Sequence, residues 1–270
     1  MKTAFMSTAS AHSRRFSWQP PTASHDARPM RALLSLFATA LLIVAWPSVA
    51  RAAELEPFVA TYDAWYQGKQ AGTATMRLQP QGKQWQVDLG IRGNRGFAGI
   101  LGLNLEQDTL FDVADGGYRP LRQSTTRKAA VFFNRKVEGI YDWTNNVARW
   151  TGDLSKRRRE PVQLQPGDMS ALLINLAVMR DATPNAALQY RFVDGGRVRQ
   201  YAYQAASEPE LVQVGEISYS ALRVSRTNGG NDEMIIWVAD GVPTPVRILQ
   251  REDGEDAVDL RLVEYQGAPQ

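Results

Sequence analysis

Apolar and polar residues alternate along most of the chain after residue 57, which is the pattern of strands with one buried and one exposed face. In the first run the apolar residues are Phe58, Ala60, Tyr62 and Ala64, and a turn follows at residues 67–69. Similar runs and turns recur at roughly 8–12-residue spacing. About a dozen strands are predicted in this way. They cover residues 58–64, 73–78, 85–91, 105–113, 121–127, 131–141, 147–151, 188–193, 197–205, 211–214, 217–226, 234–238, 246–251 and 258–265.

One stretch breaks the alternation and predicts a helix. Residues 166–181 read PGDMSALLINLAVMRD, and the apolar residues of this stretch would cover most of the circumference of a helix. A helix that is apolar nearly all round has to be buried on more than one side, and a sheet that curls around it supplies that burial. We therefore predict a mainly β fold, a single curled antiparallel sheet or half-open barrel with one buried helix near 168–180. Four apolar residues form the main helical stripe: Met169, Leu172, Leu173 and Leu176.

Residues 30–52 have the three parts of a secretory signal peptide. Met30-Arg31 is a short positive start, residues 32–46 are an apolar block, and the small residues Ala50 and Ala52 form a cleavage site. The block is shorter than the ~20 residues that a membrane-spanning helix needs, so no transmembrane segment is predicted. We expect cleavage near Ala52 and a periplasmic location.

The signal peptide sets the predicted domain organisation. Residues 53–270 are interpreted as a single β-rich domain, since no linker and no internal repeat divides them. Residues 1–29 are interpreted as a start codon assigned too early or as a disordered leader. A twin-arginine export signal at Ser13-Arg14-Arg15 is disfavoured because its arginines lie far from the apolar block.

The net charge of the exported part differs from that of the whole chain. Six of the 31 Lys and Arg residues but only one of the 28 Asp and Glu residues lie in residues 1–52. The remainder therefore carries 25 basic and 27 acidic residues. The basic isoelectric point of about 9.2 belongs to the leader, so no nucleic-acid partner is predicted.

The residue types after the leader exclude several classes of enzyme. Both histidines, His12 and His25, precede residue 53, and the chain has no cysteine. Mechanisms that use Ser-His or Cys-His pairs are therefore excluded, as are ordinary zinc, haem and iron–sulfur sites. We predict a non-enzymatic protein with no catalytic residue, no cofactor and no metal. A glycosidase-type pair stays open, because four carboxylates are scattered along the strands: Asp63, Glu106, Asp142 and Glu216.

Three polar features each have a structural and a functional interpretation. Asp168 precedes the helix and is interpreted as its N-cap, with a partly buried catalytic or binding acid as the alternative. The basic run Lys156-Arg157-Arg158-Arg159 is interpreted as a solvated hairpin tip, and the alternative is contact with anionic lipid headgroups. The acidic segment 252–256 lacks the oxygen spacing of a calcium loop and is interpreted as a turn.

Five apolar residues are candidates for lining a ligand cavity between the helix and the sheet. Large curled sheets often leave space that side chains do not fill, and this space accepts apolar ligands. The alternative is that these residues are simply core. They are Met169, Leu172, Leu173, Leu176 and Trp237.

Several motifs together resemble the bacterial domain of unknown function 3108 family. The stretch PGDMSALLINL (166–176) resembles its small-Asp-x-Ser-x-Leu helix start. The segment VDGGR (193–197) lies in the strand pair that follows, and MIIWVADGVPTPVRIL (234–249) resembles its tryptophan segment with a Pro-Val-x-Ile strand. The opening at 58–78 is similar to the family's first hairpin. The motif residues map to Asp168, Ser170, Trp237 and Pro245.

The resemblance implies an exported, β-rich envelope protein whose biochemical role is not established. It also suggests an architecture similar to the half-open barrels of periplasmic lipoprotein carriers, which is an analogy of fold and does not license a function. No catalytic role comes with the motif residues.

Two main functions are therefore in view. The first is a periplasmic binding or carrier protein that holds a lipid or another apolar small molecule between sheet and helix. The second is an envelope scaffold with a solid core that contacts an envelope protein through strand edges or through residues 156–159. A hydrolase that uses paired carboxylates is the third and weakest hypothesis.

Overall fold

The computed structural model describes residues 55–93, 104–129 and 133–267. The signal peptide and leader predicted for residues 1–52 lie outside these ranges. Within the described ranges, no helix combines the length and the apolar character that crossing a bilayer requires.

The described residues form sixteen β-strands, the α-helix α2 (Ala171–Asp181) and the 3-10 helix η1 (Lys156–Arg159). The strands are β1 (Phe58–Tyr66), β2 (Lys69–Gln81), β3 (Gln84–Gly93), β4 (Asn104–Ala114), β5 (Gly117–Ala129), β6 (Phe133–Asp142), β7 (Val147–Gly152), β8 (Val162–Gln163), β9 (Asp168–Met169), β10 (Ala187–Asp194), β11 (Arg197–Ala205), β12 (Glu210–Val214), β13 (Ile217–Arg226), β14 (Glu233–Ala239), β15 (Arg247–Glu252) and β16 (Glu255–Gly267).

All sixteen strands belong to one sheet, with the order β8-β7-β6-β5-β4-β3-β2-β1-β16-β15-β14-β13-β11-β10-β9 and with β12 beside β13. Every pair is antiparallel except β9 with β10. The strands at the two edges of the sheet are β8 and β9, which are separated in the chain by residues 164–167 alone. Strand β8 pairs only with β7, and β9 pairs only with β10. Because β8 and β9 do not pair with each other, the sheet is not closed into a barrel. The predicted single, mainly antiparallel sheet is therefore confirmed.

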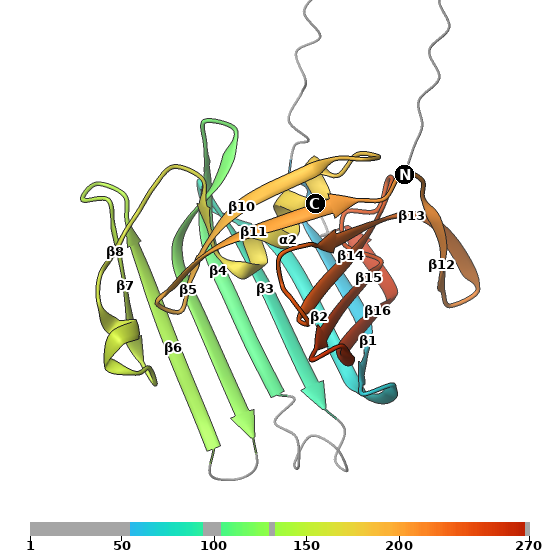
Figure 1. Cartoon of the computed structure of the whole chain (residues 1–270), viewed down its shortest axis with the longest axis horizontal. Helices are drawn as coiled ribbons and strands as arrows, with labels where there is room; N and C mark the ends of the chain where they lie inside the picture. Colours follow the sequence, from blue (N-terminus) through green and yellow to red (C-terminus); the bar gives the residue numbers. More distant parts are fainter. Residues whose placement is uncertain (1–54, 94–103, 130–132, 268–270) are drawn as a thin grey trace, which may run out of the picture. The chain divides into compact units, whose positions relative to one another are not determined.

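The sheet is curled, because strands far apart in its order meet again. Strand β5 contacts β9, and the Tyr141 hydroxyl on β6 donates a hydrogen bond of 2.6 Å to the Val193 carbonyl on β10. Figure 1 shows β10 and β11 crossing the long strands β3–β5 near helix α2. The structure has more strands than predicted, partly because β8 and β9 have two residues each and are too short to alternate.

Helix α2 is confirmed, but its start differs from the prediction. It begins at Ala171 rather than near residue 168, and its N-cap is Ser170 rather than Asp168. The Ser170 hydroxyl accepts a hydrogen bond of 3.4 Å from the Leu173 amide and lies 2.9 Å from the Thr109 hydroxyl on β4. The cap therefore also fixes the helix to the sheet.

The helix starts later because Asp168 and Met169 belong to β9, which pairs with Arg191 and Phe192 of β10. The Arg191 guanidinium donates to the Asp168 carboxylate at 2.6 Å. This partner lies 23 residues away in the chain, so the local pattern around Asp168 does not reveal it.

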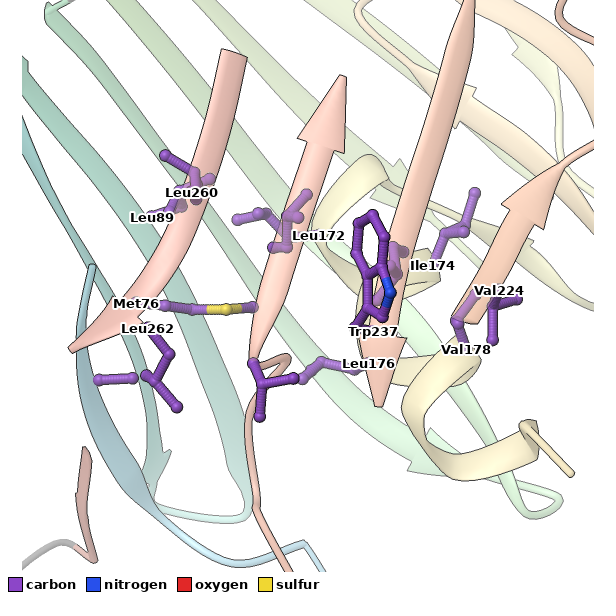
Figure 2. Packing of buried hydrophobic residues seen from close by; sticks show 14 of the residues in the cluster. Met76, Leu89, Leu172, Ile174, Leu176, Val178, Val224, Trp237, Leu260 and Leu262 are labelled. Atoms are coloured by element: carbon purple, nitrogen blue, oxygen red, sulfur yellow. The ribbon is translucent and has the colours of Figure 1, made fainter. Parts of the chain in front are cut away.

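Helix α2 lies in the apolar core, as its all-round apolar pattern predicts. It contacts β3, β4 and β5 from one part of the sheet and β9, β10 and β14 from the other. Figure 2 shows Leu172, Leu176 and Val178 of the helix among side chains of β2, β3, β13, β14 and β16. Six helix residues are buried: Leu172, Leu173, Ile174, Leu176, Ala177 and Val178.

Candidate functional site

The structure brings the five predicted cavity-lining residues together in one apolar cluster. Leu173 is fully buried, and the side chain of Trp237 is 5% exposed. The Trp237 indole N–H donates to the Glu210 carboxylate of β12, and the Arg247 guanidinium stacks over its ring, 4.7 Å from the centroid. The other three, Met169, Leu172 and Leu176, are at most 6% exposed.

Two depressions on the surface of the described residues lie away from this cluster. The first has a volume of about 540 Å³ and is lined by Arg135, Asp153, Leu154, Ser155, Arg158 and Arg159. The second has a volume of about 380 Å³ and is lined by Arg119, Leu121, Tyr141, Asp142, Trp143 and Thr144. None of the five predicted residues lines either depression.

The first depression, called the arginine depression below, concentrates positive charge from separate parts of the chain. Arg135 comes from β6, and Arg158 and Arg159 come from η1. Arg127 on β5 and Arg197 on β11 also lie within electrostatic range of Arg158. Burial lowers the pKa of Arg158, and Arg197, Arg127 and Arg135 lower it further, while Asp194 opposes them.

The sheet register and two short turns position these arginines. The pairing of β5 with β6 places Arg127 directly opposite Arg135, and side chains at opposed positions share one face of a sheet. Residue Asp153, after β7, is held at β6 because its carboxylate accepts the Lys136 amide at 2.9 Å. The segment that leads into η1 is therefore held beside the first half of β6.

The turn between β10 and β11 fixes helix η1 from the other side. Arg158 Nε donates to the Gly195 carbonyl at 2.8 Å. A Cβ added at Gly196 would lie 1.9 Å from the Arg158 carbonyl oxygen, and Gly196 has φ +68°. Only glycine therefore allows this turn to approach the backbone of η1 so closely.

Replacing Gly196 by alanine should move this turn away from η1. The left-handed conformation costs an alanine about 1–2 kcal/mol, and the overlap with Arg158 adds about 1–3 kcal/mol. The control is Gly215→Ala, because Gly215 has φ +58° but open space around a Cβ, so only the first cost applies. Urea unfolding of both variants measures the difference, and equal losses would show that the turn does not press on η1.

Asp194, just before that turn, links the arginine depression to helix α2. Its carboxylate accepts the Ala171 amide at 3.2 Å, so it binds the positively polarised N-terminus of the helix. Burial raises the pKa of Asp194 from 3.8 to about 6, against the opposing effects of the Ala171 amide, Arg158 and Arg197. Part of its charge is therefore lost in mildly acidic conditions.

The raised pKa of Asp194 predicts a pH dependence of stability. Between about pH 4 and pH 6 the folded protein retains a proton on Asp194 that the unfolded chain has released, so this residue lowers stability as the pH rises. The total amounts to at most about 3 kcal/mol. In Asp194→Asn the contribution vanishes while an acceptor for the Ala171 amide remains. Between pH 4 and pH 7 the unfolding free energy of the unmodified protein should therefore fall relative to that of Asp194→Asn as the pH rises. Parallel profiles of the two proteins would contradict the raised pKa of Asp194.

The structure places two further polar segments interpreted from the sequence. The basic run 156–159 lies in the connection between the antiparallel strands β7 and β8 with none of its residues buried, as predicted, and there it forms the 3-10 helix η1. The segment 252–256 contains the turn between β15 and β16, as predicted, with Asp253 and Gly254 at positive φ.

The four scattered carboxylates have local surroundings on different elements. Asp63 accepts the Gln70 side-chain amide at 3.0 Å, and Glu106 lies 3.8 Å from Lys128. Asp142 accepts both the backbone and the side-chain amide of Asn145, which lowers its pKa. Glu216 lies in the exposed turn between β12 and β13.

Sequence reasoning missed Arg127, Arg135 and Arg197 as parts of a site. Only the basic run at 156–159 gave a signal, and it contributes Arg158 and Arg159. The other three arginines join them through strand register and through the curl of the sheet.

A family model described as "Protein of unknown function (DUF3108)" matches residues 61–261. The chain belongs to the DUF3108 family. This confirms the resemblance seen in the sequence, and the matched residues include α2 and the arginine depression.

Among solved structures, this DUF3108 protein is similar to a β-barrel-like protein of domain of unknown function DUF1849 from Brucella abortus. The identity is 10%, the TM-score is 0.43, and the match covers 80% of this chain and 100% of that one. No curated protein matches the chain.

In this DUF3108 protein the four family-motif residues occupy structural positions. Asp168 pairs with Arg191, and Ser170 caps α2. Trp237 bonds Glu210. The Pro245 carbonyl accepts the Tyr62 hydroxyl at 2.9 Å, in the buried interior. The motif therefore specifies how the helix and the strands join.

Proposed function

We propose that this protein is a non-enzymatic envelope protein that acts as a binding or scaffold module through its surface, with its interior filled. The observation that carries the proposal is the burial of the five predicted cavity residues, each at most 6% exposed, in one apolar cluster. A helix apolar on all sides completes such a core, because both parts of the sheet pack on it.

A periplasmic location is part of the proposal, and residues 30–52 support it. The positive start, the apolar block and the small residues at 50 and 52 are the parts of a cleavable export signal. N-terminal sequencing of the protein recovered from the periplasm is expected to begin at Ala53. Recovery of the chain in the cytoplasm, with residues 30–52 intact, would overturn this part.

The alternative function is carriage of a lipid or another apolar ligand between α2 and the sheet. Native purification followed by lipid extraction and mass spectrometry distinguishes this carrier function from the proposed one. Titration of a fluorescent fatty acid is the second measurement. The proposal predicts no hydrophobe in stoichiometric amount and no saturable fatty-acid binding. A stoichiometric hydrophobe, with binding that Leu176→Ala changes and Leu211→Ala leaves unaltered, would establish the carrier instead. Leu176 lies in the core and Leu211 is 78% exposed.

A further inference from the structure

The arginine depression holds like charges together although their repulsion opposes folding. Arg127 and Arg135 are opposed on neighbouring strands, and like charges at opposed positions destabilise a sheet. Arg158 lies close enough to Arg127, Arg135 and Arg197 for each of them to lower its pKa. Arginine stays protonated at any pH that a protein tolerates, so deprotonation cannot relieve this repulsion.

Arg135, Arg158 and Arg159 line the arginine depression, Arg127 and Arg197 lie within electrostatic range of Arg158, and two carboxylates of the described residues are placed near them. Asp153 lines it, and its carboxylate is bonded to the Lys136 amide. Asp194 is held by the Ala171 amide at the start of α2. Among the described residues, the carboxylates of Asp153 and Asp194 therefore stand against the guanidinium groups of Arg127, Arg158, Arg159 and Arg197, so positive charge is in surplus before Arg135 is counted.

Backbone carbonyls hold two of the arginines of the depression in place. Arg158 is fixed by the Gly195 carbonyl, and Arg159 donates to the Gly152 carbonyl at 3.0 Å. Gly196 allows the close contact that holds the turn on η1. The depression, of about 540 Å³, is open to solvent, so a ligand can reach it directly.

We propose that the arginine depression binds a phosphate group, either on a soluble phosphate compound or on a phospholipid headgroup. A planar carboxylate is satisfied by the fork of one or two guanidinium groups, whereas a tetrahedral phosphate with up to two negative charges accepts donors from several directions. Arginines of η1 and β6 line the depression, and Arg127 of β5 lies opposite Arg135, so guanidinium groups come from separate elements, which suits the second geometry. The inference deepens the proposed function, on which it rests, by naming the ligand class of the surface.

Two probes distinguish the sources of the phosphate group. Inorganic phosphate is titrated into the full exported protein by calorimetry, with acetate as the carboxylate comparison. Vesicles of phosphatidylcholine with and without phosphatidic acid are sedimented with the protein. Saturable binding of phosphate without vesicle binding supports a soluble ligand, and binding only to vesicles with phosphatidic acid supports a headgroup.

The variant Arg135→Gln/Arg159→Gln removes two lining charges, and Arg149→Gln/Arg157→Gln removes two exposed arginines that do not line the depression. The lining variant should weaken binding at least tenfold, and the control should stay within about twofold. If the lining variant does not fold, Arg127→Gln takes its place, with at least a threefold weakening expected. Because it removes the guanidinium opposite Arg135, it should also melt no lower than the unmodified protein.

The proposal is overturned if neither probe binds, if acetate binds as tightly as phosphate, or if the control loses as much affinity as the lining variant. These results are independent of the lipid-extraction experiment. A hydrophobe in the interior would overturn the proposed function without changing the phosphate titration, and absence of phosphate binding would leave the filled interior unaffected.

Discussion

Replacing Asp168 by alanine is expected to lower the free energy of unfolding by about 3–5 kcal/mol, as for other buried pairs that lose one partner. The Asp168 side chain is fully buried and that of Arg191 is 18% exposed. The variant leaves the Arg191 charge without its carboxylate and the Gln165 amide, which lies 2.8 Å from Asp168, without its acceptor. Urea unfolding followed by circular dichroism measures the loss.

The control for this variant is Glu138→Ala on the exposed face of β6. Glu138 pairs with Lys136 at 2.8 Å, but both side chains are more than half exposed. Solvent screening limits such a pair to about 0–1 kcal/mol. If Asp168→Ala cost no more than Glu138→Ala, the joint between β9 and β10 would not contribute to stability as described.

The second large effect is expected for Leu173→Ala in the middle of the core. Leu173 is fully buried between α2 and the sheet. Truncating a leucine in such a position costs about 2–5 kcal/mol, because the lost apolar contacts leave a cavity that neighbours only partly refill. Thermal unfolding by calorimetry should show a clearly lower melting temperature.

Leu211→Ala provides the matched control, since it makes the same chemical change on the exposed strand β12. Leu211 is 78% exposed, so its truncation should change stability by no more than about 0.5 kcal/mol. Similar melting temperatures for the two variants would show that α2 is not part of the core.

The sequence predicted the strands well where alternation directly reflects burial. Phe58, Ala60, Tyr62 and Ala64 are all buried on β1 and their neighbours are half-buried. The position of the helix was also predictable, because an apolar circumference has to be enclosed. Both signals are local, and each depends on residues within one element.

The start of the helix could not be predicted, because a distant residue decides it. Met169 continues the helical spacing, yet it pairs with Phe192 of β10. Asp168 is a good N-cap by type, but Arg191 binds its carboxylate. Ser170 takes the capping position instead. Local propensity therefore lost to a contact between segments more than 20 residues apart.

The candidate site was predictable only in the basic run at 156–159. Its role depends on the opposition of Arg127 and Arg135 across β5 and β6 and on the approach of Gly196 to η1. Strand register and the curl of the sheet set both contacts. Neither feature can be obtained from the spacing of charges along the chain.

Hydrogen exchange at the amides of Leu176, Ala177 and Val178 in α2 tests most directly whether the helix is enclosed core. If both parts of the sheet pack on the helix, these amides exchange only when the whole domain unfolds. Their opening free energies should then equal the unfolding free energy from urea titration. Opening free energies well below that value would contradict the account, because the helix would detach from a sheet that stays folded.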